Sequence, residues 1–180
     1  MPSDAISLRH ATADDIPALE ALIEASVRGV GARHYSAVQI EQSLDHLFGV
    51  DQRLIDDGTY YVAEAEETLV GSGGWSRRQT PFGGDQAASV RDATLRDPDT
   101  DPAVIRAFFV DPEWTRRGIG HALLVHCEQA ARAEGFDRFE LTATLSGHAF
   151  YRSEGYTDVN QIDIPLSDGV SLQAIVMRKP

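Results

Sequence analysis

The chain has 180 residues, of which 42% are hydrophobic, and it carries a formal net charge of -12 at pH 7. This length is enough for one domain with a good core, or for one domain with a large insertion. The acidity and the lack of a dense basic patch argue against nucleic acid as a partner. They suit an amine or other cationic substrate, although many proteins are acidic for no such reason.

No apolar run reaches membrane-spanning length, and the N-terminal segment lacks the pattern of a secretory signal, so no membrane partner is expected. The single cysteine, Cys127, falls on the apolar side of a predicted helix. We expect a packed thiol that forms no internal disulfide, and a cytoplasmic protein.

Residues 6–10 alternate as a first strand. A pattern similar to a capping box, with Thr12 and Asp15, then predicts a helix that Gly29 and Gly31 break.

A second helix follows, which Ser36 can cap. The connector between the two helices contains His34 and Tyr35. An ordinary polar turn is the simplest interpretation of His34, and the role of Tyr35 is open.

Residues 60–65 and 69–76 predict a β-hairpin with a turn at residues 66–67. Residues 77–102 then mix arginine, aspartate, glycine and proline with few apolar anchors. A loop of this length is usually a functional lid or a disordered segment. We expect a lid or a subunit contact that gains order only against a substrate or a partner, with a short helix within residues 87–95 as an option.

Residues 104–110 predict a buried strand, and a basic turn at residues 115–120 opens a helix that Gly135 ends. The free N–H groups and the dipole of such a helix favour an anion, and Gly118 and Gly120 let a phosphate approach the backbone. The turn fits neither a P-loop nor a dinucleotide fingerprint. The alternative interpretation is a strand, turn and helix in which the two glycines only permit tight packing and bind no phosphate.

The segment VDPEWTRRGIGHALL resembles the acyl-CoA signature of GNAT-superfamily N-acetyltransferases, (Q/R)-x-x-G-x-(G/A), with Gly118 and Gly120 in register and Thr115 in place of the usual Gln or Arg. The resemblance implies acetyl-CoA as co-substrate, no metal, and an oxyanion met by a backbone N–H near Phe109 or Val110. The residues implied in CoA binding are Phe109, Val110, Thr115, Arg116, Arg117, Gly118, Ile119, Gly120 and His121.

The remaining segments predict a strand at 139–145, a short helix at 148–153 capped by Ser146, and a terminal β-hairpin. This order of elements predicts the α/β class, with a mixed central β-sheet and helices on both faces. The order is similar to that of GNAT proteins over nearly the whole chain. We therefore expect one GNAT-like domain over residues 1–180, with a long insertion at about residues 77–102.

The segment from Phe150 to Tyr156 resembles a second GNAT block, in which Tyr151 matches the tyrosine that many members use as general acid. A phenol near the leaving CoA thiolate can supply a proton without competing negative charge. Packing of the short helix is the alternative role for Tyr151. The family's asparagine seven residues earlier is Thr144 here, which puts that CoA contact in doubt.

The general base is the least determined residue. The strand before the signature offers Arg106 and no acid, and Glu113 lies beyond its end. We take Glu140 on the next strand as the catalytic candidate, with a solvent-facing position or a water relay as alternatives.

The resulting hypothesis is an acyl-CoA-dependent N-acyltransferase in which an amine of a small molecule or peptide attacks the thioester directly in a ternary complex. A non-catalytic acyl-CoA-binding or regulatory module is the main alternative. A nucleotide-binding protein is disfavoured by the two failed loop patterns, and a homodimer is left open.

Overall fold

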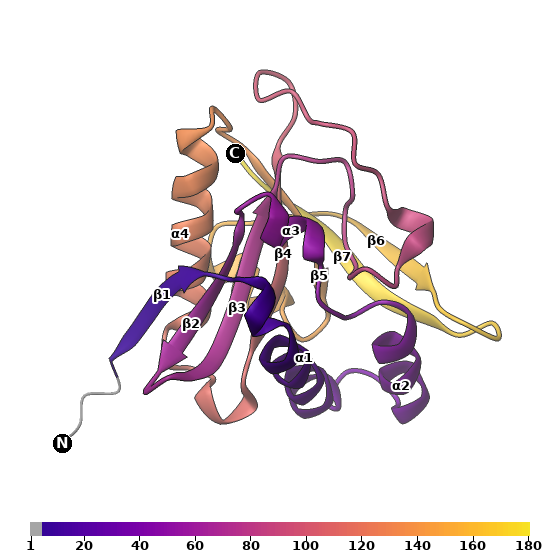
Figure 1. The fold of residues 1–180 in the computed structure, drawn as a ribbon. Helices are drawn as coiled ribbons and strands as arrows, with labels where there is room; N and C mark the ends of the chain where they lie inside the picture. The colour runs from indigo at the N-terminus through magenta and orange to yellow at the C-terminus, as the bar shows by residue number, and fades with distance from the viewer. Residues whose placement is uncertain (1–4) are drawn as a thin grey trace.

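The computed structural model describes residues 5–180. Its helices and strands are β1 (Ile6–His10), α1 (Ile16–Gly31), α2 (Ala37–His46), α3 (Gln52–Asp56), β2 (Tyr60–Ala65), β3 (Thr68–Ser76), β4 (Ala103–Val110), α4 (Ile119–Ala133), β5 (Phe139–Thr144), α5 (His148–Ser153), β6 (Thr157–Pro165) and β7 (Ser171–Lys179), with short 3-10 turns η1 (Ala13–Asp15), η2 (Ala88–Val90) and η3 (Pro112–Trp114) (Figure 1). Within these residues, no helix is both long and apolar enough to cross a membrane.

The strands form one seven-stranded sheet in the order β1-β2-β3-β4-β5-β7-β6, in which only β4 and β5 pair in parallel. Alternate residues of β2 enter different cores: Tyr61 and Ala63 pack with α4, whereas Tyr60 and Val62 pack with α1 and α3. Both faces of the sheet are therefore covered by helices (Figure 1). The predicted α/β class with a mixed sheet is confirmed.

The strands β4 and β5 part soon after they meet. Ala103 pairs with Phe139 and Val104 with Glu140, and no further pair joins the two strands. The rest of β4, residues 105–110, therefore has no strand partner on its β5 side, and its backbone groups there are available for other hydrogen bonds.

A bulge reshapes β4 beside this parting. Opposite β3, Gly74 pairs with Arg106 but Ser72 pairs with Phe109, so β4 contains an extra residue. Ala107 lies in the bulge with φ +60, and its carbonyl accepts a hydrogen bond of 3.1 Å from the Ser72 hydroxyl. This anchor holds a backbone conformation that non-glycine residues rarely adopt.

Two local predictions are wrong, for reasons of packing. Helix α1 ends at Gly31, as predicted, but Gly29 does not break it; Gly29 is needed because a Cβ there would lie 2.4 Å from Cγ of Pro112. Gly147, and not Ser146, precedes α5, and the Ser146 hydroxyl instead donates to the Val30 carbonyl at 3.4 Å. The short helix α3 has no counterpart in the predictions.

Other end signals are confirmed. The Ser36 hydroxyl accepts from the Gln39 N–H at 3.2 Å at the start of α2. Gly135 follows α4 in the left-handed region with φ +96.

The insertion at 77–102 is ordered by its own chain, which corrects the expectation that it gains order only against a substrate or a partner. The N–H groups of Gly84 and Asp85 donate to the carbonyls of Leu47 (2.8 Å) and Val50 (3.0 Å). Ala87 is 7% exposed and packs in a cluster that includes residues of α2, β6 and β7. Only the short turn η2 forms in place of the helix considered for residues 87–95.

Candidate functional site

The turn between η3 and α4 has the backbone geometry of an anion cradle. Arg116 and Gly118 both have left-handed conformations, with φ +61 and +81, and Gly118 directly precedes α4. The first hydrogen bond of the helix runs from the Ala122 N–H to the Gly118 carbonyl at 3.0 Å. The N–H groups of residues 119–121 therefore have no acceptor within the helix and favour a bound anion.

The two glycines of the turn serve different purposes. Gly118 is required by its backbone, and a Cβ there would meet no atom within 4 Å. Gly120 is closely packed, since a Cβ would lie 3.2 Å from Cζ of Phe150 and the ring would have to move slightly. Gly120 therefore also gives room to the Phe150 ring of α5, and its role in the approach of a phosphate stays a prediction.

Two arginines bring positive charge to the cradle. The guanidinium of Arg117 lies over the Trp114 ring, with its Cζ 4.4 Å from the ring centroid. Arg116 is exposed in the turn itself. Both positions suit electrostatic attraction of a phosphate.

The remaining predicted side chains of the turn are used in local contacts. Thr115, which replaces the family's Gln or Arg, donates its hydroxyl to the Pro112 carbonyl at 3.2 Å. His121 lies 2.9 Å through Nδ1 from the Glu154 carboxylate and so joins the first turn of α4 to the end of α5. The buried Ile119 packs in the core under α4. These contacts shape the cradle.

Tyr151 lies in an aromatic enclosure. It is 9% exposed, and its ring centroid lies 5.0 Å from that of Phe150, 5.9 Å from that of Tyr156 and 6.2 Å from that of Phe108. Within residues 5–180 its hydroxyl makes no hydrogen bond. Burial raises the pKa of Tyr151, so the phenol is protonated at neutral pH.

Short contacts connect the cradle to this phenol. Phe150 packs against Gly120 in the first turn of α4 and against Tyr151 in the next helix. Phe108 then joins Tyr151 to the part of β4 that has left β5. The structure therefore brings the anion cradle, the phenol and the unpaired β4 edge together.

The two backbone positions predicted for an oxyanion point to opposite sides of β4. The Asp111 N–H donates to the Val70 carbonyl of β3 at 2.9 Å. Because successive N–H groups alternate along a strand, that of Phe109 also faces β3, whereas that of Val110 faces the unpaired side. Val110 is thus the better placed of the two.

Glu140 is held away from this neighbourhood. It pairs with Val104 where β4 and β5 are still joined, and its carboxylate lies 2.8 Å from Nε of Arg178 and 3.8 Å from Nη2 of Arg96. These contacts disfavour Glu140 as a base, and that role stays a prediction.

Arg106 occupies the strand position where a base was sought, and its surroundings were not predicted. Its side chain is 4% exposed, and Nη1 lies 2.7 Å from Oδ2 of Asp51, which is 1% exposed. Arg91 binds the same carboxylate at 2.9 Å. Burial lowers the pKa of Arg106, and Asp51 opposes this. Burial acts to raise the pKa of Asp51, but Arg91 and Arg106 outweigh it and hold that pKa below its usual value.

Other candidate residues have structural roles. The Tyr35 hydroxyl donates to the Gln173 carbonyl at 2.6 Å and accepts from the Leu145 N–H at 2.9 Å, which joins the α1–α2 connection to β7 and the end of β5. Thr144 accepts from the Gly147 N–H at 3.2 Å. Burial raises the pKa of Cys127, which is fully buried, so its thiol is neutral and unsuited to attack a thioester.

Glu113 is exposed within η3, and His34 is exposed in the α1–α2 connection. In the part of the chain that the structure describes, no three His, Cys, Asp or Glu side chains are grouped so that they could hold a metal ion.

The chain is similar to known proteins in sequence and in fold. Residues 23–156 match the model of the acetyltransferase (GNAT) family. A search of curated proteins found no match. Among solved structures, a GCN5-related N-acetyltransferase from Rhodopseudomonas palustris superposes with a TM-score of 0.72 at 21% identity, over 99% of this chain and 98% of that one.

Two further structures have similar folds. The PaiA N-acetyltransferase from Thermoplasma acidophilum, solved in complex with coenzyme A, has a TM-score of 0.66 at 18% identity, over 97% of this chain and 98% of that one. A ribosomal-protein-alanine N-acetyltransferase from Brucella melitensis has a TM-score of 0.62 at 21% identity, over 96% of this chain and 98% of that one.

Proposed function

Because this chain belongs to the GNAT acetyltransferase family, we propose that it transfers an acyl group, acetyl in the simplest case, from acetyl-CoA to an amine by direct attack in a ternary complex. The observation that carries the proposal is the protonated, unbonded phenol of Tyr151 beside the cradle at the start of α4. A buried thiol at Cys127 favours direct attack over an acyl-enzyme.

The cradle fits the pyrophosphate of CoA. Its left-handed residues Arg116 and Gly118, the free N–H groups of residues 119–121 and the charge of Arg117 all favour a phosphate group. The Thermoplasma acidophilum relative contains coenzyme A, which supports the same co-substrate here. Acetyl-CoA would supply the activated thioester.

In this proposal the chain's own groups handle charge and protons. The Val110 N–H, on the unpaired side of β4, stabilises negative charge that develops on the carbonyl oxygen. Tyr151 gives its hydroxyl proton to the leaving sulfur as the carbon–nitrogen bond forms and the carbon–sulfur bond breaks. We assign the proton of the attacking amine to water, because Glu140 is engaged by Arg178 and Arg96.

A non-catalytic acyl-CoA-binding module is a second candidate. One observation favours it: the strand position considered for a base is held by Arg106, which is buried and paired with Asp51. Without a base on the enzyme, the transferase reaction needs an acceptor whose amine is already deprotonated. A binding module needs neither a base nor an acceptor.

The deciding experiment incubates the purified protein with acetyl-CoA and a panel of small-molecule and peptide amines, and follows release of free CoA thiol together with the mass of the acetylated product. Thiol release that depends on the amine supports the transferase. CoA binding measured by calorimetry, with no release for any amine in the panel, favours the binding module. Absence of CoA binding contradicts both.

A further inference from the structure

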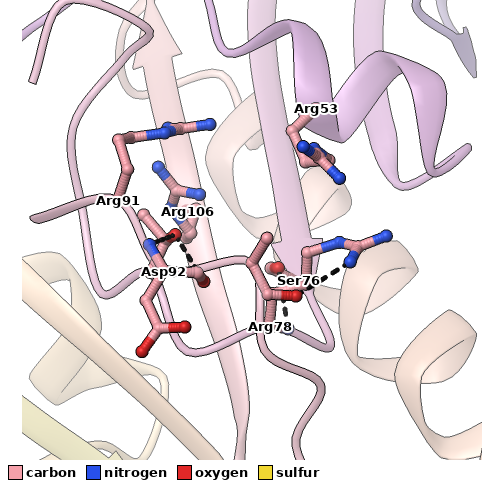
Figure 2. Close-up of a pocket in the computed structure, with 8 residues that line it drawn as sticks. Arg53, Ser76, Arg78, Arg91, Asp92 and Arg106 are labelled. Carbon is pink, nitrogen blue, oxygen red and sulfur yellow. Dashed lines mark hydrogen bonds between the residues drawn. The ribbon is translucent and has the colours of Figure 1, made fainter. Parts of the chain in front are cut away.

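Four arginines converge on a cavity that the acyl-transfer proposal does not use. The cavity has a volume of about 210 Å³ and lies between α3, the end of β3, the insertion and β4 (Figure 2). Its lining includes Arg53, Arg78, Arg91 and Arg106. The whole chain has only 16 Lys and Arg residues against 28 Asp and Glu, so this gathering of cations is unusual for the protein.

The acidic groups nearby leave one of these cations unpaired. Asp57 binds Arg78, Asp51 is shared between Arg91 and Arg106, and Asp85 lies 4.0 Å from Arg91. Within residues 5–180, Arg53 has no carboxylate within 4 Å. Arg53 acts on Asp57 only through longer-range electrostatics, so its guanidinium forms no ion pair that a ligand would have to displace.

Asp92 is the one acidic residue in the lining of the cavity, and its carboxylate binds the backbone of its own loop. Asp92 accepts a hydrogen bond from the Thr94 N–H at 3.0 Å through its side chain. In Figure 2 its carboxylate points away from the guanidinium groups of Arg91 and Arg106. The carboxylate of Asp92 does not fill the space between the arginines.

The second observation is an unsatisfied donor on Arg106, one of the residues that line the cavity. Arg106 is 6% exposed and uses its two terminal nitrogens for Asp51 and the Gly83 carbonyl. Its Nε is buried and has no hydrogen-bond partner. Buried guanidinium donors are normally satisfied, and an oxygen of a bound anion would satisfy this one.

We propose that this four-arginine cavity binds a small oxyanion, a carboxylate or phosphate group, through Arg53 and Nε of Arg106. Guanidinium groups recognise both anions by the same charge-assisted hydrogen bonds. The anion has two sources: an acidic group carried by the acceptor, or a free anion that acts as an effector. An acidic group on the acceptor would be the ligand only if the proposed acyl transfer is correct. Anion binding at the cavity does not depend on that proposal.

The position of Arg106 gives the site a connection to the reaction centre. Arg106 directly precedes Ala107, whose bulge lies where β4 has left β5. It extends on the face of the sheet that carries α3, whereas Tyr151 packs in the core on the α4 face. An anion bound here is therefore next to the strand that carries the Val110 N–H.

The test is calorimetric titration of the protein with inorganic phosphate and with acetate, at constant ionic strength set with chloride. We expect saturable binding that Arg53→Gln weakens by roughly tenfold or more, the loss of one charge-assisted contact. Arg53→Gln breaks no ion pair, so the fold is kept. The matched control is Arg33→Gln, which removes an exposed, unpaired arginine outside the cavity and should leave anion affinity unchanged.

A spectroscopic readout reports on the buried donor directly. The Nε–H proton of Arg106, assigned by its loss in Arg106→Lys, should shift with the same anion dependence as the calorimetric signal. Absence of saturable binding up to about 10 mM anion overturns the proposal. Binding that Arg53→Gln leaves unchanged, or that Arg33→Gln weakens equally, also overturns it.

The two sources are separated with matched acceptors, one bearing a carboxylate and the other its amide. If the acceptor supplies the anion, Arg53→Gln raises KM for the carboxylate form alone. If a free anion is the ligand, phosphate changes turnover of both acceptors equally and Arg53→Gln removes that effect. Anion binding is measured without CoA or acceptor, so its failure is distinct from a failure of the acyl-transfer proposal.

Discussion

Replacement of Asp51 by asparagine should destabilise the protein strongly while leaving the side-chain shape nearly unchanged. The Asp51 carboxylate accepts from Arg106 at 2.7 Å, from Arg91 at 2.9 Å and from the Arg53 N–H at 3.0 Å. Asparagine removes the negative charge and leaves the guanidinium of Arg106, 4% exposed, without a counter-ion. Breaking a buried ion pair from one side costs about 3–5 kcal/mol.

This loss is large on the scale of the whole protein. Domains of this kind have unfolding free energies of about 5–15 kcal/mol, and for 150–250 residues each kcal/mol shifts Tm by about 2–4 °C. Asp51→Asn should therefore lower Tm by about 6–20 °C. The assay is urea unfolding followed by circular dichroism, with thermal scans in parallel.

The matched control is Glu41→Gln, whose partner is Arg28. These two side chains are 59% and 44% exposed, so water screens the pair and its loss should change stability little. Asp51→Asn combined with Arg106→Met should recover part of the lost free energy, because it also removes the uncompensated charge. A loss for Asp51→Asn no larger than that for Glu41→Gln would refute the reasoning.

The pH dependence gives an independent check of the same pair. Since the folded state holds the pKa of Asp51 below its unfolded value of about 3.9, its contribution to stability is complete above that pH and is lost as pH falls through the folded pKa. The unfolding free energy of Asp51→Asn should accordingly fall less steeply than that of the parent protein below about pH 4.

Three further predictions concern the proposed reaction. Tyr151→Phe keeps the packing but removes the proton donor, so kcat should fall by roughly ten- to a thousandfold while the calorimetric Kd for acetyl-CoA stays the same; unaltered turnover would exclude Tyr151 as the acid. Arg116→Asn should weaken CoA binding and reduce its dependence on salt, because it removes a positive charge from the cradle. The protein should keep its stability, because asparagine tolerates the positive φ of this position. The control Arg138→Asn, on the exposed loop before β5, should leave CoA binding unchanged. If water takes the amine proton, the pH profile of kcat/KM should shift with the amine pKa when two acceptors of different basicity are compared; a fixed profile would instead show a base on the enzyme.

The sequence predicted those features that are decided by neighbouring residues. The β4 strand, the turn at 115–120 and α4 follow from apolar periodicity and from glycines at the two ends of the helix, and all three lie where they were expected. The position of Tyr151 followed from a motif of adjacent residues in α5. The reason for Gly120 did not, because the ring it accommodates belongs to Phe150, thirty positions later in the chain.

The sequence could not reveal contacts between distant segments. Helix α3, two strands and the insertion separate Asp51 from Arg106 in the chain, and no local pattern near either residue indicates its partner. One signal was present: an arginine within the apolar run AVIRAFFV of a buried strand needs a buried acid. The insertion was misjudged for the same reason, since its order comes from Leu47 and Val50, which a local pattern does not show.

The β4 bulge explains how one strand serves both proposed sites. Arg106 and Ala107 are consecutive yet both face α1 and α3, because the extra residue interrupts the alternation of side chains. After the bulge, Phe108 faces α4 and meets Tyr151, and the Val110 N–H turns to the side that β5 has left. In a regular strand side chains alternate, so Phe108 would face α1 like Arg106. The N–H groups after Arg106 would also point to the opposite sides of the strand. The positive φ of Ala107 costs about 1–3 kcal/mol, and such strain persists where surrounding contacts fix it, here the hydrogen bond from Ser72. The bulge therefore lies between the proposed anion site on one face of the sheet and the groups proposed for acyl transfer on the other.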